Sequence, residues 1–174
     1  MTPMPQRVWF ERVFAPGIPV ESFPEILERL RGTPARIEER MRGINADDMR
    51  RRIGDAWSIQ EHVGHLADLE PLWFGRLKDL AEGRPELRPA DLENTATWQA
   101  KHNDATSESV LAEFRARRTE LVRHLESLAE TDQRATALHP RLRQPMTVAD
   151  LCFFVAEHDD HHLATVSRLM KTFC

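Results

Sequence analysis

Residues 148–170 contain neither glycine nor proline, and a cluster of histidines lies among them. Apolar residues recur there every three or four positions, which is the pattern of a helix that buries one face. The core-facing row consists of Leu151, Val155, His158, His162, Val166 and Leu169. Because residues four apart lie on the same face of a helix, His158 and His162 point in the same direction. The stretch therefore predicts a long amphipathic helix with two imidazoles on its buried face.

Two imidazoles on a buried face need partners, since an unpaired buried polar group costs roughly 2–7 kcal/mol. A divalent metal ion would satisfy both rings at once, and imidazole suits zinc, nickel, copper and iron. In the alternative interpretation, His161, Asp159 and Asp160 form a solvated face, and His158 makes a hydrogen bond within the protein. The spacing of the histidines is compatible with both interpretations.

A second helix is predicted over residues 59–80, with a kink at Pro71. Ser58 and Glu61 have the spacing of a capping box, in which each side chain accepts a hydrogen bond from the backbone N–H of the other residue. Trp57 precedes this cap, at a position where an apolar residue packs back onto the first turn. The start of this helix is therefore well defined by the sequence.

The second helix carries another pair of histidines, His62 and His65, three positions apart on one face. Gly64 lies between them, and its missing side chain lets another element approach closely. One histidine from this helix, together with His158 and His162, would make three metal ligands. Three protein ligands with an open position are typical of a catalytic metal rather than a structural one.

Two further amphipathic helices are predicted. One starts at the capping box Ser22–Glu25 and continues to about residue 43, and it is either kinked or divided at Thr33–Pro34. The other covers residues 107–129, where apolar residues form one face and arginines and glutamates cover the rest. No stretch alternates strongly enough to predict a strand. We therefore expect an all-α four-helix bundle, whose sites are built from inward side chains on facing helices.

The 174 residues have the length of a single domain. Residues 1–22 contain several prolines and aromatic residues, and we expect an extended arm anchored on the bundle or on a partner subunit. Residues 84–106 form a long connection that allows a crossover between the second and third helices. His102 and Asn103 are candidates for lining a pocket there, but we interpret them as surface residues.

Charge and composition exclude several classes of partner. The net charge of −4 gives no basic surface for nucleic acid. The sequence has no apolar stretch long enough to span a membrane and no signal core at its start, so we expect a cytoplasmic protein. Cys152 lies in an apolar run and is expected in the core, whereas Cys174 is expected to be exposed. The paired Glu-x-x-His motifs of di-iron bundles and a phosphate-binding loop are both absent.

The motifs WSIQEHVGHLADLE at residues 57–70 and HDDHHLA at residues 158–164 resemble those of the DinB/YfiT-like superfamily. The resemblance implies an up-down-down-up four-helix bundle, commonly a homodimer, which holds a divalent metal on three histidines. The metal in such proteins is often zinc or nickel. Carried over position by position, the ligands are His65, His158 and His162.

Characterised members of this superfamily include thiol-dependent S-transferases and a mycothiol-dependent maleylpyruvate isomerase. The resemblance therefore implies a metal-dependent S-transferase or hydrolase that acts on a small molecule, with a low-molecular-weight thiol as a possible second cofactor. A metal-bound water or thiol would be the nucleophile, because the metal lowers its pKa. The alternatives are a non-catalytic, stress-linked metal-binding dimer and a bundle whose histidines are only structural.

Other polar residues lie close to these ligands in the sequence. Metal-bound imidazoles usually donate their second N–H to a carboxylate or a carbonyl, and the candidates for this role are Glu61, Asp68 and Asp159. His62 and His161 lie one helical step from the ligands and are candidates for lining the mouth of a pocket. We expect the choice of substrate to depend on residues 1–24 and 84–106.

Overall fold

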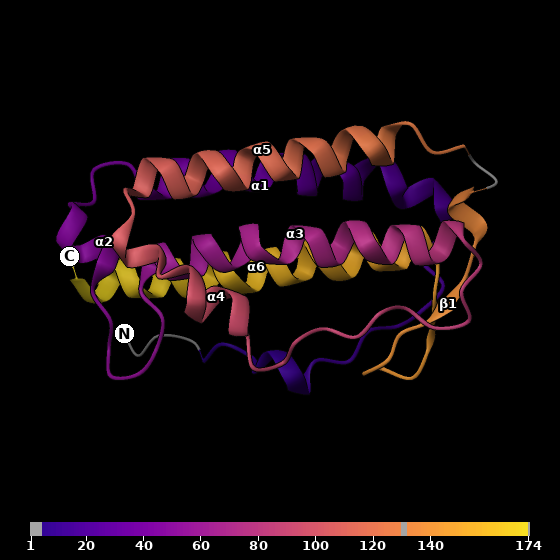
Figure 1. Cartoon of the computed structure of the whole chain (residues 1–174), viewed down its shortest axis with the longest axis horizontal. Coiled ribbons are helices and arrows are strands. Elements are labelled where there is room, and N and C mark those ends of the chain that lie inside the picture. Colours follow the sequence, from indigo (N-terminus) through magenta and orange to yellow (C-terminus); the bar gives the residue numbers. More distant parts are fainter. Residues whose placement is uncertain (1–4, 130–131, 174) are drawn as a thin grey trace.

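Four long helices dominate the computed structural model, which describes residues 5–129 and 132–173. They are α1 (Phe23–Met41), α3 (Ile59–Ala81), α5 (Ser107–Glu126) and α6 (Val148–Phe173). These helices run lengthwise beside one another (Figure 1). The predicted all-α four-helix bundle is therefore confirmed.

The direction of the helices gives the bundle its topology. Helices α1 and α6 run in one direction, whereas α3 and α5 run in the other (Figure 1). Helix α3 packs against both α5 and α6, and α1 packs against the same two helices. Residues 82–106 connect α3 to α5 by returning along the length of the bundle. This is the predicted up-down-down-up arrangement, and it places the histidines of α3 beside those of α6.

Short elements occupy the connections. They are the 3-10 turns η1 (Trp9–Glu11), η2 (Val20–Ser22), η3 (His102–Asp104) and η4 (Asp132–Arg134), the helices α2 (Ala46–Arg50) and α4 (Thr95–Ala100), and the strands β1 (Ala137–Leu138) and β2 (Pro145–Met146). The two strands pair antiparallel, with Ala137 opposite Met146. A strand of two residues is too short to show an alternating pattern, so the sequence carried no signal for it.

The predicted capping box at the start of α3 is present in full, and α6 starts in the same way. At α3, the side chain of Ser58 accepts from the backbone N–H of Glu61 at 3.1 Å, and Glu61 accepts from that of Ser58 at 2.9 Å. At α6, Thr147 and Asp150 exchange equivalent hydrogen bonds of 3.2 and 3.0 Å. Such caps each contribute about 1 kcal/mol, and here they fix where the two histidine-bearing helices begin.

The predicted capping box at Ser22 was wrong. Ser22 has φ −85° and ψ −4°, and its side chain makes no capping hydrogen bond. The reason is that η2 runs directly into α1, so Ser22 already has a helix-like backbone instead of the extended backbone that a capping residue needs.

Helix α1 is continuous through Pro34, which answers the question that its sequence left open. Proline has no N–H for the carbonyl four residues earlier, which is that of Leu30. In the structure this carbonyl accepts a hydrogen bond of 3.2 Å from Arg118 of α5. The neighbouring helix therefore supplies the donor that proline lacks.

The N-terminal arm lies on α6. The rings of Trp9 and Phe14 lie 5.2 and 5.0 Å from the ring of Phe154. The carboxylate of Asp150 accepts hydrogen bonds of 2.9 Å from the backbone N–H groups of Gly17 and Ile18. The arm is thus anchored on the bundle, as the first of the two predicted alternatives stated. Residues 1–4 of the arm lie outside the described residues.

The apolar core has two parts with a polar layer between them. One part includes Leu30, Trp73, Leu125 and Phe154, and the other includes Ile37, Val63, Phe114 and Val166. Each long helix contributes to both parts and carries a buried polar residue between its two contributions: Thr33 on α1, Glu70 on α3, Arg118 on α5 and Asp159 on α6. Next to this layer, the ring of His65 on α3 lies 5.4 and 4.9 Å from the rings of His158 and His162 on α6.

Two further expectations concern cysteine and membranes. Cys152 is buried in the core, as predicted, while Cys174 lies outside the described residues. No helix in the described part of the chain combines the length and the apolar content that a membrane span requires.

Candidate metal centre

The structure brings His65, His158 and His162 together between α3 and α6. One ring nitrogen from each residue lies within 4.8 Å of those of the other two, and all three side chains are buried. The Nε2 atoms of His158 and His162 are 3.2 Å apart. Two nitrogens that each bind a tetrahedral zinc ion at about 2.0–2.1 Å lie roughly 3.3 Å apart. The pair therefore has the spacing that a shared metal ion requires.

The other ring nitrogens show what the three imidazoles lack. Nδ1 of His65 lies 3.0 Å from the hydroxyl of Thr97, and Nδ1 of His162 lies 2.8 Å from Nδ1 of His62. Nδ1 of His158 is buried without a hydrogen-bond partner among the described residues. A hydrogen bond between Nε2 of His158 and Nε2 of His162 would use one lone pair, and it would give His65 no partner in this group. A cation can take a lone pair from all three rings, so the donor set fits a divalent metal.

Burial keeps these imidazoles neutral at physiological pH. It lowers the pKa of His65 to about 3, and it lowers the pKa of His158 and His162 well below the ordinary value of 6.5. Neighbouring histidines lower these pKa values further. Neutral imidazole is the form that binds metal ions, so the site needs no deprotonation before binding.

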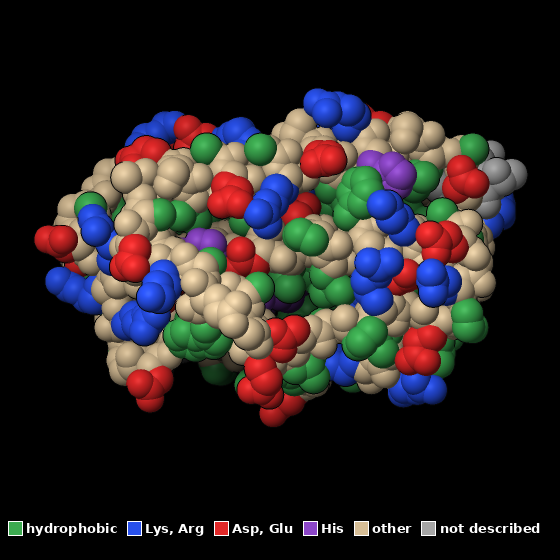
Figure 2. Space-filling view, in the orientation of Figure 1, with side chains coloured by type: hydrophobic (Ala, Val, Ile, Leu, Met, Phe, Trp, Pro, Cys, Tyr) green, Lys and Arg blue, Asp and Glu red, His purple; other side chains and the backbone are tan. Residues whose placement is uncertain are grey.

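A cavity of about 450 Å³ opens from the three histidines along α3 and α6. The arm covers it with Trp9 and Phe10, and residues 89–92 of the crossover form another wall. Figure 2 shows this face hollowed near its middle, with hydrophobic and histidine side chains at the bottom of the hollow. The volume lies in the range of small-molecule sites, so a ligand of that size has access to the histidines.

The residues that the sequence suggested around the ligands are placed in different ways. His62 contacts His162, and His161 lines the cavity and lies 3.0 Å from the amide nitrogen of Gln6. Glu61 caps α3 and forms an ion pair with Arg52, and it is not brought to a histidine ligand.

The two aspartates also differ from each other. Asp68 accepts a hydrogen bond of 2.8 Å from His102 and lies beside the Thr97 that contacts His65. Asp159 points to the opposite side of α6, where it meets Thr33 and Arg118. Asp68 therefore lies near a predicted ligand, whereas Asp159 belongs to the polar layer.

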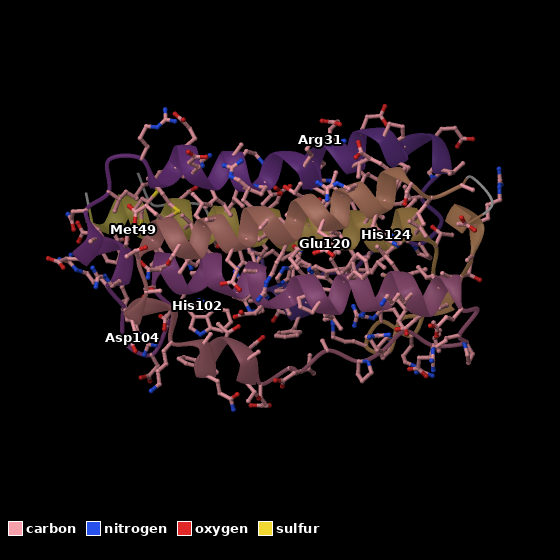
Figure 3. The ribbon with its side chains drawn as sticks, turned by 45° about the horizontal axis from the view of Figure 1, so that its top comes forward. Arg31, Met49, His102, Asp104, Glu120 and His124 are labelled. Atoms are coloured by element: carbon pink, nitrogen blue, oxygen red, sulfur yellow. The ribbon has the colours of Figure 1, made fainter. Side chains whose placement is uncertain are left out.

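The interpretation of His102 as a surface residue was wrong, because its side chain is only 6% exposed. A Cβ atom on Gly64 would lie 2.2 Å from Cδ2 of His102, so the ring packs directly on the glycine. Figure 3 shows His102 beside α3, on the crossover segment. Gly64 was the signal for this contact, since it predicted the close approach of another element without identifying it.

The arginines of α5 were all expected on its exposed face, and Arg118 does not follow this prediction. It is 1% exposed and donates to Glu70 at 2.6 Å and to Asp159 at 2.5 Å. Burial alone would lower the pKa of Arg118, but the two carboxylates raise it above its ordinary value. Because Asp159 follows His158 directly, this network also fixes the turn of α6 that carries a predicted ligand.

Comparison with known proteins agrees with the fold and the motifs. The sequence profile of the DinB superfamily matches residues 29–166. The solved structure of YfiT from Bacillus subtilis, described as a probable metal-dependent hydrolase with an unusual four-helix bundle topology, is 22% identical. It matches with a TM-score of 0.77 and a coverage of 94% of each chain.

A second solved structure, the mycothiol-dependent maleylpyruvate isomerase, is 10% identical with a TM-score of 0.66. This match covers 84% of the present chain and 60% of the isomerase. No curated protein sequence matches the chain. At these identities the two structures establish a shared fold, and the profile match establishes the family.

Proposed function

The chain belongs to the DinB superfamily, and from this premise we propose that it is a metal-dependent enzyme that acts on a small molecule. One observation carries the proposal: three buried, neutral imidazoles converge at the inner end of a cavity of about 450 Å³. A structural metal site is closed by four protein ligands, whereas this group has three and faces the cavity. A substrate can therefore reach the position that the protein leaves open.

The residues of the chain have distinct roles in this proposal. His65, His158 and His162 hold one divalent ion, which when bound supplies a Lewis acid and lowers the pKa of a water or thiol. Thr97 orients His65 from the crossover, and His62 orients His162 from α3. The apolar rings of the arm exclude bulk water from the cavity, which strengthens electrostatic interactions inside it.

Two reaction classes are compatible with such a site. Hydrolysis is the first candidate, supported by the likeness to YfiT, which is described as a probable metal-dependent hydrolase and matches over nearly the whole chain. Thiol-dependent transfer is the second, supported by the likeness to a mycothiol-dependent isomerase. Zinc and nickel are the metals we propose, since imidazole suits both and the family resemblance of the motifs implies them.

Metal content is the test of this proposal. The protein is purified without a nickel column, and bound metal is measured by mass spectrometry before and after loading with zinc or nickel. We expect about one equivalent of bound metal per chain in the wild type. In His65→Ala and in His162→Ala we expect the metal content to be at least tenfold lower. His124→Ala is the matched control, because His124 lies on α5, outside the residues that line the cavity (Figure 3).

Folded wild-type protein that takes up no metal would contradict the proposal and favour purely structural histidines. If metal binds, the loaded protein is tested on ester and amide substrates, and on electrophiles with and without low-molecular-weight thiols. Metal binding without any turnover would support the non-catalytic alternative. Circular dichroism of each variant ensures that a loss of metal is not a loss of helix.

A further inference from the structure

The end of the cavity away from His65, His158 and His162 holds Arg76 and Arg141, and neither forms an ion pair within 4 Å with an acidic side chain of the described residues. Arg76 is 1% exposed; it donates to the carbonyl of Arg88 at 3.1 Å, and its Nη1 lies 3.1 Å from Nε2 of His139. No acidic side chain in the described part of the chain lies within 4 Å of its guanidinium nitrogens. Asp79, one turn further along α3, instead binds Arg88 with two hydrogen bonds of 2.8 and 2.9 Å.

Arg141 is the second of these arginines. Its Nη2 atom is buried and has no hydrogen-bond partner within the described ranges. The guanidinium lies over the ring of Phe10 at 5.3 Å and over the ring of Phe154 at 5.9 Å. Both rings line the cavity, so the cation faces aromatic surface where a hydrogen-bond acceptor is missing.

His139, between the two arginines, faces donors on both sides of its ring. Nε2 lies next to Arg76, and Nδ1 lies 3.2 Å from the backbone N–H groups of both Arg141 and Leu142. A neutral imidazole has one lone pair in its plane, so it can accept on one side only. This end of the cavity therefore has more hydrogen-bond donors than the protein has acceptors for them.

The charges show the same imbalance. Burial lowers the pKa of Arg76 to about 10. The negative charge of Asp79 opposes this shift from beyond hydrogen-bonding distance, while the positive charges of Arg141 and Arg88 add to it. Burial also lowers the pKa of Arg141. A buried or half-buried cation without an ion-pair partner is unfavourable, and groups with pKa values shifted in this way cluster at functional sites.

We propose that Arg76 and Arg141 form a subsite for the carboxylate of a small molecule. A guanidinium matches a carboxylate with two parallel N–H···O bonds, and the unused donors here belong to such groups. The walls between this end and the histidines are apolar and include Leu69, Leu72, Trp73 and Phe154. They fit an apolar body with a single planar anionic group rather than a doubly charged phosphate, which needs a more polar shell.

The inference extends the proposed function by naming a substrate class, an apolar carboxylic acid derivative that spans the cavity. Binding of the carboxylate depends on the arginines alone. Any reaction at the other end of the molecule, beside the three histidines, rests on the proposed function. Because Arg76, Arg141 and the three histidines all line one cavity, a single small molecule can contact both ends.

The test uses benzoate as the probe, with benzamide as its neutral analogue and phenyl phosphate as the alternative anion. Binding is followed by calorimetry and by the fluorescence of the tryptophans that line the cavity, Trp9, Trp57 and Trp73. The protein is a metal-free His65→Ala/His162→Ala variant as well as the wild type, so that binding to a metal is separated from binding to the arginines. We expect benzoate to bind in both proteins and benzamide to bind at least tenfold more weakly.

Arg141→Gln is expected to weaken benzoate binding at least tenfold. Arg143→Gln is the matched control: Arg143 lies two residues further along the loop, is exposed and pairs with Glu86 at 3.0 Å, so its loss leaves binding unchanged. Arg141 is half-buried, and its replacement leaves the Arg118 network intact. Circular dichroism shows whether each variant has the helix content of the wild type.

Absence of benzoate binding, equal binding of benzamide, or an Arg141→Gln variant that binds as the wild type does would each overturn the subsite. Arginine-dependent binding of phenyl phosphate that is tighter than that of benzoate would overturn its assignment to carboxylates. Failure of the metal proposal gives a different result, because benzoate binding would then persist in a protein that takes up no zinc or nickel.

Discussion

Arg118 and Arg76 are equally buried, at 1% exposure, yet their surroundings differ completely. Arg118 lies between the carboxylates of Glu70 and Asp159 and also donates to a backbone carbonyl. Arg76 has a carbonyl and an imidazole as its partners and no carboxylate within 4 Å in the described part of the chain. Both guanidinium groups are charged; the charge of Arg118 is balanced by two carboxylates within the fold, whereas Arg76 lies beside a cavity without an ion-pair partner in the described part of the chain.

The difference separates a structural network from a binding site. In the polar layer, charge and hydrogen bonding are nearly complete within the fold, and among its described residues a single buried side-chain atom, Oε2 of Glu70, lacks a partner. Around the cavity, donors and lone pairs remain in excess at both ends, as guanidinium N–H groups at one end and imidazole nitrogens at the other. Buried polar groups normally find partners, so groups that do not are candidates for ligand contacts.

The largest expected effect is that of removing the cation from the completed network. Arg118→Met would leave Glu70 and Asp159 buried without a positive partner, and we expect a loss of roughly 3–5 kcal/mol in the free energy of unfolding. Urea denaturation measures this loss. The exposed Arg115 pairs with Glu38, and Arg115→Met should change stability by at most about 1 kcal/mol. An equal loss of unfolding free energy in both variants would show that the buried ion pairs of Arg118 contribute no more than an exposed one.

Metal should complete the histidine end of the cavity in the same way that carboxylates complete the polar layer. Zinc at 100 times its dissociation constant is expected to stabilise the wild type by about 2.7 kcal/mol, because only the folded chain brings the three ligands together. A chelator should reverse the effect, and His162→Ala should show none of it. Thermal denaturation with and without zinc is the measurement, and an equal response of His162→Ala would contradict the assignment.

Packing around the histidine end is tight, and Gly64 tests it. Gly64→Ala would place Cβ 2.2–2.5 Å from the ring of His102, and we expect a loss of roughly 1–3 kcal/mol in the free energy of unfolding. The double variant with His102→Ala should recover part of this loss. Gly32 in α1 has open space around it, so Gly32→Ala should stabilise by about 0.4–1 kcal/mol. A stabilised Gly64→Ala protein would show that the crossover is not packed on α3.

The smallest expected effect completes the contrast with Arg118. Arg76→Met removes a buried cation that has no carboxylate partner, so it leaves no unpaired acid behind. We expect a change of less than about 1 kcal/mol in the free energy of unfolding, since apolar replacement of buried charges is often neutral or stabilising. A loss as large as that of Arg118→Met, measured by the same urea titration, would assign Arg76 a structural role.

Much of the fold followed from local signals. The cap at Ser58 and the helical spacing of apolar residues act within a few positions, and the structure contains the helices they predict. The cap predicted at Ser22 failed because a preceding 3-10 turn changed its backbone, and the two-residue strands were too short to carry a pattern. Local sequence signals predict an element reliably where several of them agree over several helical turns. They predict it poorly where the assignment depends on one residue.

The candidate site was predicted in part. His158 and His162 share a face because of their spacing alone, and His65 was carried over from the motif of a resembling family. Thr97 and His102 were missed, since the crossover has no periodic pattern that would place its side chains against α3. Gly64 indicated that something would pack there, but an absent side chain does not identify its neighbour.

The sequence by itself determined four amphipathic helices, the capped start of α3 and a pair of histidines on one buried face, because periodicity and capping are local properties of the chain. The tertiary structure alone decided which charged residues are neutralised. Arg118 meets Asp159 across 41 positions of the sequence, and Arg76 meets His139 across 63 positions. Such pairs depend on how the helices and loops pack in space, so no pattern along the chain could distinguish the paired arginine from the unpaired one.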